Sequence, residues 1–298
     1  MLLQVLGTAA GGGLPQWNCA CPGCAGARAH PRRRRLHASL AVRADERRWY
    51  LVGATPDIGE QIERCPHLRP GPGRRDSPVA GVVLTDAELD HTLGIARLRE
   101  ADGFDILATA PVRDALVGRL RLGEILAPYT RVAWRELGPD AVPLADGVGV
   151  EVSAVPLAAK RPRYAAGTGP DLRTWAVALR LHEPATGRTL LYAPSLARWT
   201  EDFQRAAEAA DVVIADGTFW DDDEPARAGL PTATATGMGH LPISGPDGTA
   251  RRLAGLRARC LYTHLNNTNP LADPDADQHA LLARSGIEVA TDGMVIDL

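Results

Sequence analysis

The chain has 298 residues, with 33 lysines and arginines against 36 aspartates and glutamates, for a formal charge of −3. This balance excludes a strongly basic surface built to neutralise a phosphate backbone, so no nucleic-acid partner is expected. No stretch approaches the roughly 20 apolar residues of a membrane span, and the first residues lack the basic start of a secretory signal. The 5 cysteines are an odd number, and three of them lie at positions 19, 21 and 24, which is not a disulfide framework. They indicate a reducing, cytoplasmic setting and a metal site.

Short apolar runs bounded by glycine, proline and aspartate predict strands that are buried on at least one face. In chain order these runs cover residues 2–7, 40–43, 49–52, 79–85, 104–108, 148–155, 175–181, 190–193, 212–215, 260–263, 287–290 and 294–298. The runs 40–43 and 49–52 are spaced as a hairpin, and the last two runs resemble a second hairpin.

Helical patterns alternate with these strands and cover residues 57–65, 92–101, 112–121, 199–210, 246–259 and 275–285. Thr200 is a candidate N-cap because two acidic residues follow it. Strands in both halves, with helices between and after them, predict an α/β fold with two sheets. No linker is long enough to separate two domains, so we expect residues 1–298 to form one domain.

A cysteine clip, defined here as Cys19, Cys21 and Cys24, is the first candidate metal site. Three thiolates at this spacing suit a tetrahedral structural zinc ion, and Pro22 and Gly23 predict a tight turn that faces them toward one ion. Redox use of the Cys-x-x-Cys pair is disfavoured because no thioredoxin-like strand and helix surround it. The fourth ligand stays open, between a residue from far along the chain and His30, His37 or Cys65.

A cluster of polar side chains follows the buried strand 79–85. Asp86, Glu88, Asp90 and His91 precede the predicted helix 92–101. Carboxylates and an imidazole are costly to bury at the end of an internal strand unless they bind something. A helix-capping role for Asp90 would explain one acid but not the cluster. The pattern therefore predicts metal-binding or catalytic use, with Asp90 and His91 offering an oxygen and a nitrogen to one ion.

Three more candidates come directly after strand-like runs or lie in glycine-rich loops. They are Asp216, His240 and His264. Together with His91 they are what a metal pocket at the ends of strands would require. The remaining histidines lack such a context and are expected at the surface; these are His30, His37, His67, His182 and His279.

The glycine run 11–13 and the cysteine clip resemble the opening of one branch of the metallo-β-lactamase superfamily, which includes tRNA-processing nucleases and cyclic phosphodiesterases. Residues 85–94 align with the His-x-His-x-Asp-His motif of that superfamily. Further motifs at 54–57, 192–194, 216–224, 238–243 and 264–270 are similar to a family within it that takes part in synthesis of pyrroloquinoline quinone (PQQ). The resemblance implies an αββα sandwich, two mixed sheets flanked by helices, with the active site at one sheet edge.

Several positions depart from the superfamily motif. Asp86 and Glu88 replace its first two histidines, while Asp90 and His91 remain. Ser195 lies near the position of the aspartate that bridges two zinc ions in relatives, and no middle histidine is found in 155–164. The surviving set, a carboxylate at 90 with His91 and His264, disfavours a bridged zinc pair and suits non-haem Fe(II) with open positions.

The same alignment assigns roles to the remaining candidates. Asp86 and Glu88 are left as bases or additional ligands. Asp216 and His240 are expected to orient ligands or face the substrate, and His240 aligns with a catalytic histidine of related nucleases. In related phosphodiesterases a histidine three residues after the last active-site histidine completes the zinc clip. Asn267 occupies that position here, although asparagine is a poor zinc ligand.

The resemblance implies three functions that the sequence leaves open. The leading one is an iron-dependent hydroxylase that uses O₂ to oxygenate the tyrosyl ring of a Glu-Tyr-derived PQQ precursor. The others are a carrier for transport of PQQ or its precursor to the periplasm, and a metal-dependent hydrolase. The expected partners are a small-molecule or dipeptide precursor and O₂, and a homodimer is compatible with the sequence. Arg161, Arg163 or the basic run 32–35 would hold substrate carboxylates.

Overall fold

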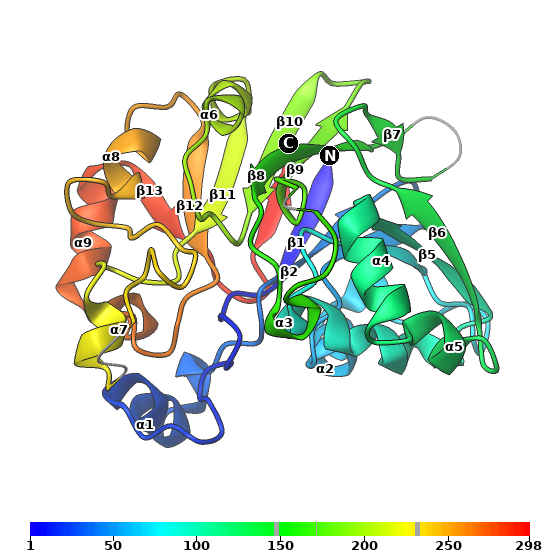
Figure 1. Cartoon of the computed structure of the whole chain (residues 1–298), viewed down its shortest axis with the longest axis horizontal. Helices are drawn as coiled ribbons and strands as arrows, with labels where there is room; N and C mark the ends of the chain where they lie inside the picture. The colour runs from blue at the N-terminus through cyan, green and yellow to red at the C-terminus, as the bar shows by residue number, and fades with distance from the viewer. Residues whose placement is uncertain (146–148, 171, 230–232) are drawn as a thin grey trace.

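Two mixed β-sheets pack face to face and are covered by helices on their outer sides (Figure 1). The computed structural model describes residues 1–145, 149–170, 172–229 and 233–298. Within these residues each sheet has seven strands. The αββα architecture expected from the sequence is confirmed.

The strands of the first sheet, in spatial order, are β14 (Val295–Asp297), β1 (Leu2–Gly7), β2 (Ser39–Arg43), β3 (Trp49–Val52), β4 (Val79–Val83), β5 (Gly103–Ala108) and β6 (Arg131–Glu136). Those of the second are β13 (Ile287–Val289), β12 (Arg259–Thr263), β11 (Val212–Asp216), β10 (Arg188–Ala193), β9 (Ala176–Glu183), β8 (Glu151–Ala158) and β7 (Val142–Pro143). Strands β3 to β6 run parallel, and so do β10 to β13. The carboxyl ends of neighbouring parallel strands therefore meet at one edge of each sheet, which is where such folds place their sites.

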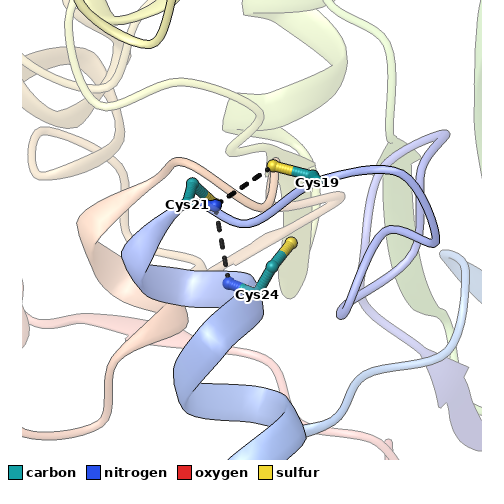
Figure 2. Close-up of side chains that lie close together, drawn as sticks. All are labelled: Cys19, Cys21 and Cys24. Atoms are coloured by element: carbon teal, nitrogen blue, oxygen red, sulfur yellow. Dashed lines mark hydrogen bonds between the residues drawn. The ribbon is translucent and has the colours of Figure 1, made fainter.

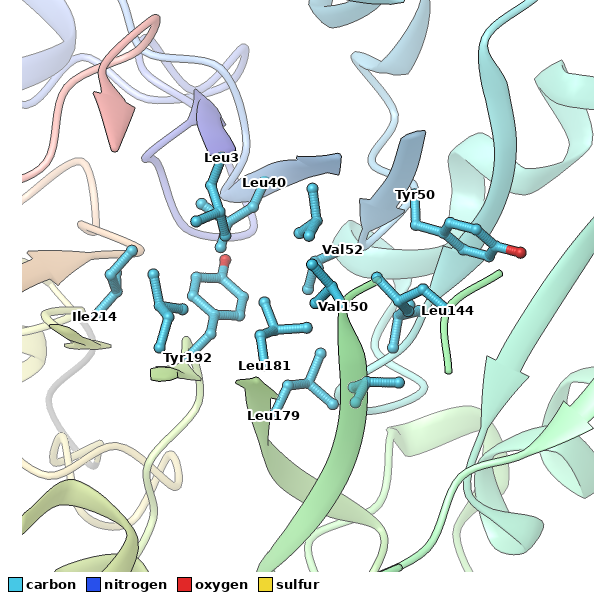
Figure 3. Packing of buried hydrophobic residues seen from close by; sticks show 14 of the residues in the cluster. Leu3, Leu40, Tyr50, Val52, Leu144, Val150, Leu179, Leu181, Tyr192 and Ile214 are labelled. Atoms are coloured by element: carbon cyan, nitrogen blue, oxygen red, sulfur yellow. The ribbon is translucent and has the colours of Figure 1, made fainter. Parts of the chain in front are cut away.

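The main core lies between the two sheets. Leu3 and Leu40 of the first sheet belong to the same buried cluster as Tyr192 and Ile214 of the second (Figure 3). Alternate residues of β11 pack into different hydrophobic layers. Val212 and Ile214 face this core, whereas Val213 and Ala215 face the outer helices. This alternation is the period-two pattern of a strand that is buried on both faces.

Helices cover both outer faces. They are α1 (Pro22–Ala29), α2 (Ile58–Arg64), α3 (Leu89–Thr92), α4 (Ala110–Gly118), α5 (Leu122–Leu126), α6 (Glu201–Glu208), α7 (Glu224–Arg227), α8 (Thr249–Leu253) and α9 (Asp277–Arg284). Helices α2, α4 and α5 contribute to the core outside the first sheet, and α6, α8 and α9 to that outside the second. The predicted N-cap is confirmed, since Thr200 Oγ1 accepts from Phe203 N at 3.1 Å. Among the described residues, no helix is both long and apolar enough to cross a bilayer.

Two of the predicted helices are too long. The predicted helix 92–101 is instead the single turn α3 followed by a 3₁₀ stretch over Leu93–Glu100. Gly94 explains the change, because its N–H bonds to Ala54 O at 2.8 Å and its Cα packs against the backbone of Thr55, so that tertiary contact replaces the regular ladder. The predicted helix 246–259 is reduced to α8, and Arg259 already belongs to β12.

Three strand predictions also need correction. The last two strands do not form a hairpin: β13 joins the second sheet by pairing with β12, and β14 joins the first by pairing with β1. The predicted strand 148–155 is β8, which begins at Glu151 and extends to Ala158, while residue 148 lies outside the described residues. The edge strand β6 was missed because its alternating pattern carries arginine and glutamate rather than an apolar run.

Truncating Leu40 tests the inter-sheet core. Leu40 is 1% exposed, so Leu40→Ala leaves a cavity and should lower the free energy of unfolding by about 2–5 kcal/mol. Leu281→Ala is the matched control, because Leu281 is 45% exposed on α9, and it should change stability by less than about 0.5 kcal/mol. Urea denaturation monitored by tryptophan fluorescence measures the free energy of unfolding of both variants. Equal losses for the two variants would contradict this assignment of the core.

Candidate metal centre

Three side chains from two sheets converge where their parallel strands end. Asp90 and His91 lie in α3, just after β4, and His264 follows β12 directly. Asp90 Oδ2 lies 3.2 Å from His264 Nε2 and 3.6 Å from His91 Nε2. One ligand atom from each residue lies within 4.8 Å of the others. The sequence predicted this set, and the structure brings its members together as one mixed nitrogen and oxygen site.

His264 has a backbone conformation that is rare outside glycine. Its φ is +60°, in the left-handed region. The next residue holds this turn in place: Leu265 N donates to Thr8 O at 2.8 Å, and Leu265 O accepts from Ala10 N at 2.9 Å. Such strain is kept where the surrounding structure over-determines it, and it is concentrated at functional sites. Here it turns the imidazole out of the strand direction toward Asp90.

The hydrogen bonds of the two histidines leave one nitrogen of each directed at the site. His91 Nδ1 donates to the two oxygens of Asp86 at 2.8 and 2.9 Å. His91 Nε2 is buried and has no hydrogen-bond partner among the described residues. A buried orphan nitrogen is uncommon, and a carboxylate that holds the far side of an imidazole is the usual support of a metal-ligating histidine. This donor set fits a metal ion.

The hydrogen bonds of His264 also leave one of its imidazole nitrogens facing the site. Thr218 Oγ1 donates its proton to Asp216 Oδ1, so it accepts from His264 Nδ1 at 2.8 Å. His264 Nε2 then carries a lone pair that faces Asp90 Oδ2. Two acceptors in contact are unfavourable unless a cation lies between them, which again favours a metal ion at this point.

Electrostatics in the metal-free protein follow from these contacts. Burial alone would lower the pKa of His91, but the charges of Asp86 and Asp90 outweigh it and raise that pKa to about 10. Burial would raise the pKa of Asp90, but the positive charge of His91 outweighs it and holds that pKa well below its usual range. Burial lowers the pKa of His264, which keeps that imidazole neutral. At neutral pH His91 is therefore protonated, and its positive charge balances the charges of Asp86 and Asp90.

Asp86 is a hydrogen-bond partner of the candidate ligand His91. Its oxygens accept from His91 Nδ1, from Thr85 Oγ1 at 2.9 Å and from Glu88 N at 2.9 Å. Glu88 is half-buried, and burial together with Asp86 raises the pKa of its carboxyl. Its carboxylate makes no hydrogen bond with a described residue, so Glu88 is the acid of this cluster that remains available for proton transfer.

A second buried network adjoins the first. Asp216 accepts from Leu196 N at 2.8 Å, Thr218 N at 2.9 Å, Thr218 Oγ1 at 2.5 Å and His240 Nδ1 at 2.7 Å. The rings of His240 and His264 stack with centroids 5.6 Å apart. Asp216, His240 and His264 also lie within metal-binding distance of one another. The oxygens of Asp216 are already filled by hydrogen bonds, however, so this group is better described as a support for the two imidazoles than as a second metal site.

His37 contributes to the site, which no local sequence pattern around it indicated. We expected His37 at the surface, yet its side chain is 12% exposed and its Nδ1 donates to Asp57 at 2.6 Å. Its Nε2 lies 3.3 Å from Gly11 O, and a Cβ on Gly11 would lie 3.3 Å from Asp90 Oδ2. His37 and Asp57 thus support the glycine segment that covers Asp90. The signal was the 54–57 motif, whose aspartate had no assigned partner.

The predicted carboxylate-binding arginines are mostly engaged elsewhere. Arg161 donates to Thr168 O at 2.7 Å and lies over the Trp175 ring at 5.3 Å. Arg33 pairs with Asp273 and Asp275, and Arg35 is largely buried and donates to Ala290 O and Thr8 Oγ1. The basic run is therefore not a free solvated loop but part of the contact between the N-terminal segment and the C-terminal part of the chain.

The cysteine clip is the second candidate metal site. Figure 2 shows Cys19, Cys21 and Cys24 gathered at the start of α1, and one Sγ from each lies within 4.8 Å of the others. The predicted turn at Pro22 and Gly23 is instead the first turn of a helix, with proline at its first position and Cys21 as N-cap. Without metal, the backbone N–H of Cys21 lowers the pKa of Cys19, and burial raises the pKa of Cys24 to about 11.

Asn267 lies at the fourth corner of this clip. Its side-chain amide is 3.1, 3.4 and 3.3 Å from the sulfurs of Cys19, Cys21 and Cys24. A half-turn of the amide would present Oδ1 in place of nitrogen. Of the local alternatives, Cys65 is excluded because its thiol bonds to Gln4 at 3.0 Å, and His37 is held by Asp57. Because Asn267 follows His264 by three residues, one loop serves both candidate sites.

Two facing sheets with a histidine and carboxylate centre at the ends of their parallel strands define the metallo-β-lactamase fold. The family model described as Beta-lactamase superfamily domain matches residues 48–264. Coenzyme PQQ synthesis protein B of Azoarcus sp. (strain BH72) is 40% identical, and that of Ruegeria pomeroyi is 43% identical, each over 100% of both chains. The crystal structure of Zn(2+)-bound PqqB from Methylobacterium extorquens is 34% identical, with a TM-score of 0.91 and 100% coverage of both chains. The chain belongs to the coenzyme PQQ synthesis protein B family.

The raised pKa of His91 predicts that metal binding displaces a proton. His91 carries that proton below about pH 10, whereas at neutral pH Asp90 is ionised and His264 is a neutral imidazole with a free Nε2 lone pair. Affinity should therefore rise about tenfold per pH unit between pH 7 and 9. Mn²⁺ is the suitable probe because it prefers oxygen and nitrogen to thiolates. Calorimetry in buffers of different ionisation enthalpy measures how many protons are released when the metal binds. A metal affinity that does not change with pH would contradict the assignment of this proton to His91.

Close packing between α1 and the Asn267 loop gives a test of the clip. A Cβ on Gly23 would lie 2.2 Å from Asn267 O, so Gly23→Ala should push the helix away from that loop. We expect lower zinc content and a lower Tm. Gly26→Ala, in the same helix, meets only Arg33 Nη1 at 3.6 Å and should stabilise the helix by up to about 1 kcal/mol. Elemental analysis of zinc content and thermal unfolding distinguish the two variants. A zinc content in Gly23→Ala equal to that of the wild type would contradict this packing.

Proposed function

We propose that the chain acts in PQQ synthesis as an iron-dependent hydroxylase of a tyrosyl ring in a Glu-Tyr-derived precursor. The observation that carries this proposal is the ligand set Asp90, His91 and His264. Two imidazoles and one carboxylate with open positions suit non-haem Fe(II) oxygenases. When bound, Fe(II) would supply the activation of O₂. Each ring hydroxylation inserts one oxygen atom and reduces the other to water, so it also consumes two electrons and two protons from an external reductant.

The absence of a usable second ligand set supports a mononuclear site. Hydrolysis in two-metal enzymes relies on a pair of ions that holds both the attacking and the leaving oxygen. In the part of the chain that the structure describes, the best second group is Asp216, His240 and His264, and its carboxylate already accepts four hydrogen bonds. His264 also already faces Asp90. This arrangement favours one ion over a bridged pair.

The other residues of the site would position groups or move protons. Asp86 orients His91, and Thr218 orients His264. Asp216 fixes the Nδ1 side of His240, which leaves Nε2 of that ring to hydrogen-bond a substrate oxygen. Glu88 has a raised pKa and is the residue we assign to take up the ring proton.

A structural zinc in the cysteine clip completes the proposal. Its ligands would be Cys19, Cys21, Cys24 and Asn267. This ion would fasten α1 to the loop that begins at His264, and so would hold one ligand of the active site in place. The Methylobacterium extorquens relative is described as Zn(2+)-bound, which supports metal binding and makes zinc the comparison metal for any test of iron.

The deciding experiment is anaerobic loading with Fe(II), followed by O₂, L-glutamyl-L-tyrosine and ascorbate as the two-electron donor, with mass spectrometry of the product. We expect a gain of one or two oxygen atoms. His91→Ala and His264→Ala should each reduce this yield at least about 100-fold, because loss of a direct ligand exceeds the 10–100-fold cost of losing its outer partner. His67→Ala is the control, since His67 stacks on Trp49 away from the site.

Other outcomes would replace the proposal with one of its alternatives. An unchanged dipeptide together with tight binding of PQQ would favour the carrier. Cleavage of the dipeptide without O₂, supported equally well by zinc, would favour the hydrolase. Zinc-loaded protein that hydroxylates as well as iron-loaded protein would exclude an iron oxygenase.

A further inference from the structure

A groove of about 720 Å³ opens beside the loop that carries His240. We call it the cationic groove and define it by Lys160, Arg173, Arg198, Thr200, Asp202 and Gly239. We infer that it binds carboxylates of the substrate, and that Lys160 and Arg198 are the residues that recognise them. This inference rests on the proposed function, because it assigns the residues that would recognise the carboxylates of that same Glu-Tyr-derived precursor.

The charges in the groove are not balanced among themselves. Arg173 Nη2 lies 3.5 Å from Asp202, whose other oxygen accepts from Arg205. The Glu201 side chain is 97% exposed and lies 4.0 Å from Arg205. These contacts leave two cations, Lys160 and Arg198, without an ion pair or hydrogen bond to any residue that the structure describes.

Lys160 is held close to the metal centre by the shape of the loop before His240. Gly239 has a φ of +86°, and a Cβ there would lie 2.4 Å from Lys160 Cδ and 3.0 Å from its Nζ. The lysine therefore lies across the backbone immediately before His240. Lys160 thus lies between the groove and His240 of the proposed active site.

A chain of contacts connects the groove to the candidate ligands. The residue after Gly239 is His240, whose ring stacks on His264, and His264 contacts Asp90. A substrate that places a carboxylate on Lys160 or Arg198 would extend from there toward these rings. The volume is within the range of ordinary small-molecule sites, so it accommodates the amino-acid end of a dipeptide.

The chemistry of the lining favours carboxylate over phosphate. Arg198 can hold a planar carboxylate through two parallel N–H bonds, and Lys160 adds a point charge. Glu201 and Asp202 also line the groove and would repel a phosphate dianion more strongly than a singly charged carboxylate. Leu157, Ala158 and Ala197 supply apolar lining for the aliphatic part of such a substrate.

Equilibrium binding tests this inference without turnover. Zinc-loaded full-length protein is dialysed against L-glutamyl-L-tyrosine and, separately, against L-glutaminyl-L-tyrosinamide, which lacks both carboxylates. We expect the wild type to bind the dicarboxylate at least tenfold more tightly than the amide. Lys160→Met and Arg198→Met should each weaken dicarboxylate binding about tenfold and reduce the preference over the amide.

Arg251→Met is the control, since Arg251 is an exposed arginine on α8 that does not line the groove. It should bind the dicarboxylate within twofold of the wild type. Circular dichroism and zinc content show whether each variant is folded. Unaltered binding in both groove variants, equal binding of the amide, no binding by the wild type, or displacement by inorganic phosphate at lower concentration would each overturn the inference. Because the assay needs neither iron nor O₂, failure of the hydroxylase proposal leaves its result interpretable.

Discussion

The turn at His264 is the constraint on which the rest of the site depends. A non-glycine residue at positive φ ends β12, and the backbone of Leu265 is bonded to the N-terminal segment at Thr8 and Ala10. These two hydrogen bonds bring segments from opposite ends of the sequence together. They place the imidazole of His264 against Asp90. Asn267, which follows His264 by three residues, is thereby placed beside the cysteine clip. A change in this turn would therefore alter the geometry of both candidate metal sites.

The buried carboxylates near this turn have different tasks because their hydrogen bonds differ. Asp86 and Asp216 accept from several donors and orient imidazoles, so little of their lone-pair capacity remains. Asp90 faces two imidazole nitrogens and is the candidate oxygen ligand. Glu88 has no hydrogen-bond partner for its carboxylate among the described residues and a raised pKa, which suits proton transfer. Position in the hydrogen-bond network, more than residue type, separates ligand, support and acid–base group here.

Membership of the metallo-β-lactamase superfamily does not require the superfamily's usual chemistry. The two sheets place polar residues at the ends of β4, β11 and β12, and these positions can carry different donor sets. In this chain the carboxylates at 86 and 88 stand where the superfamily motif has histidines, and Asp216 is committed to hydrogen bonds. The scaffold is thus retained, while the donor set favours a single ion, which is the basis for proposing oxygen chemistry in place of hydrolysis.

Much of this protein was predictable from the order of its residues. The apolar runs identified most strands, the Thr200 cap was readable locally, and the clustered cysteines and the Asp90-His91 pair marked both metal sites. Local patterns reach only as far as neighbouring residues, however. They could not show that Gly94 packs against Ala54 and Thr55 and thereby shortens a helix, or that β13 and β14 join different sheets. They also left His37 at the surface and Asp86 as a candidate ligand. The positions of His37 and Asp86 depend on which residues meet in the folded chain. The hydrogen bond from His37 to Asp57 and that from His91 to Asp86 form only when the chain has folded, so only the tertiary structure determines them.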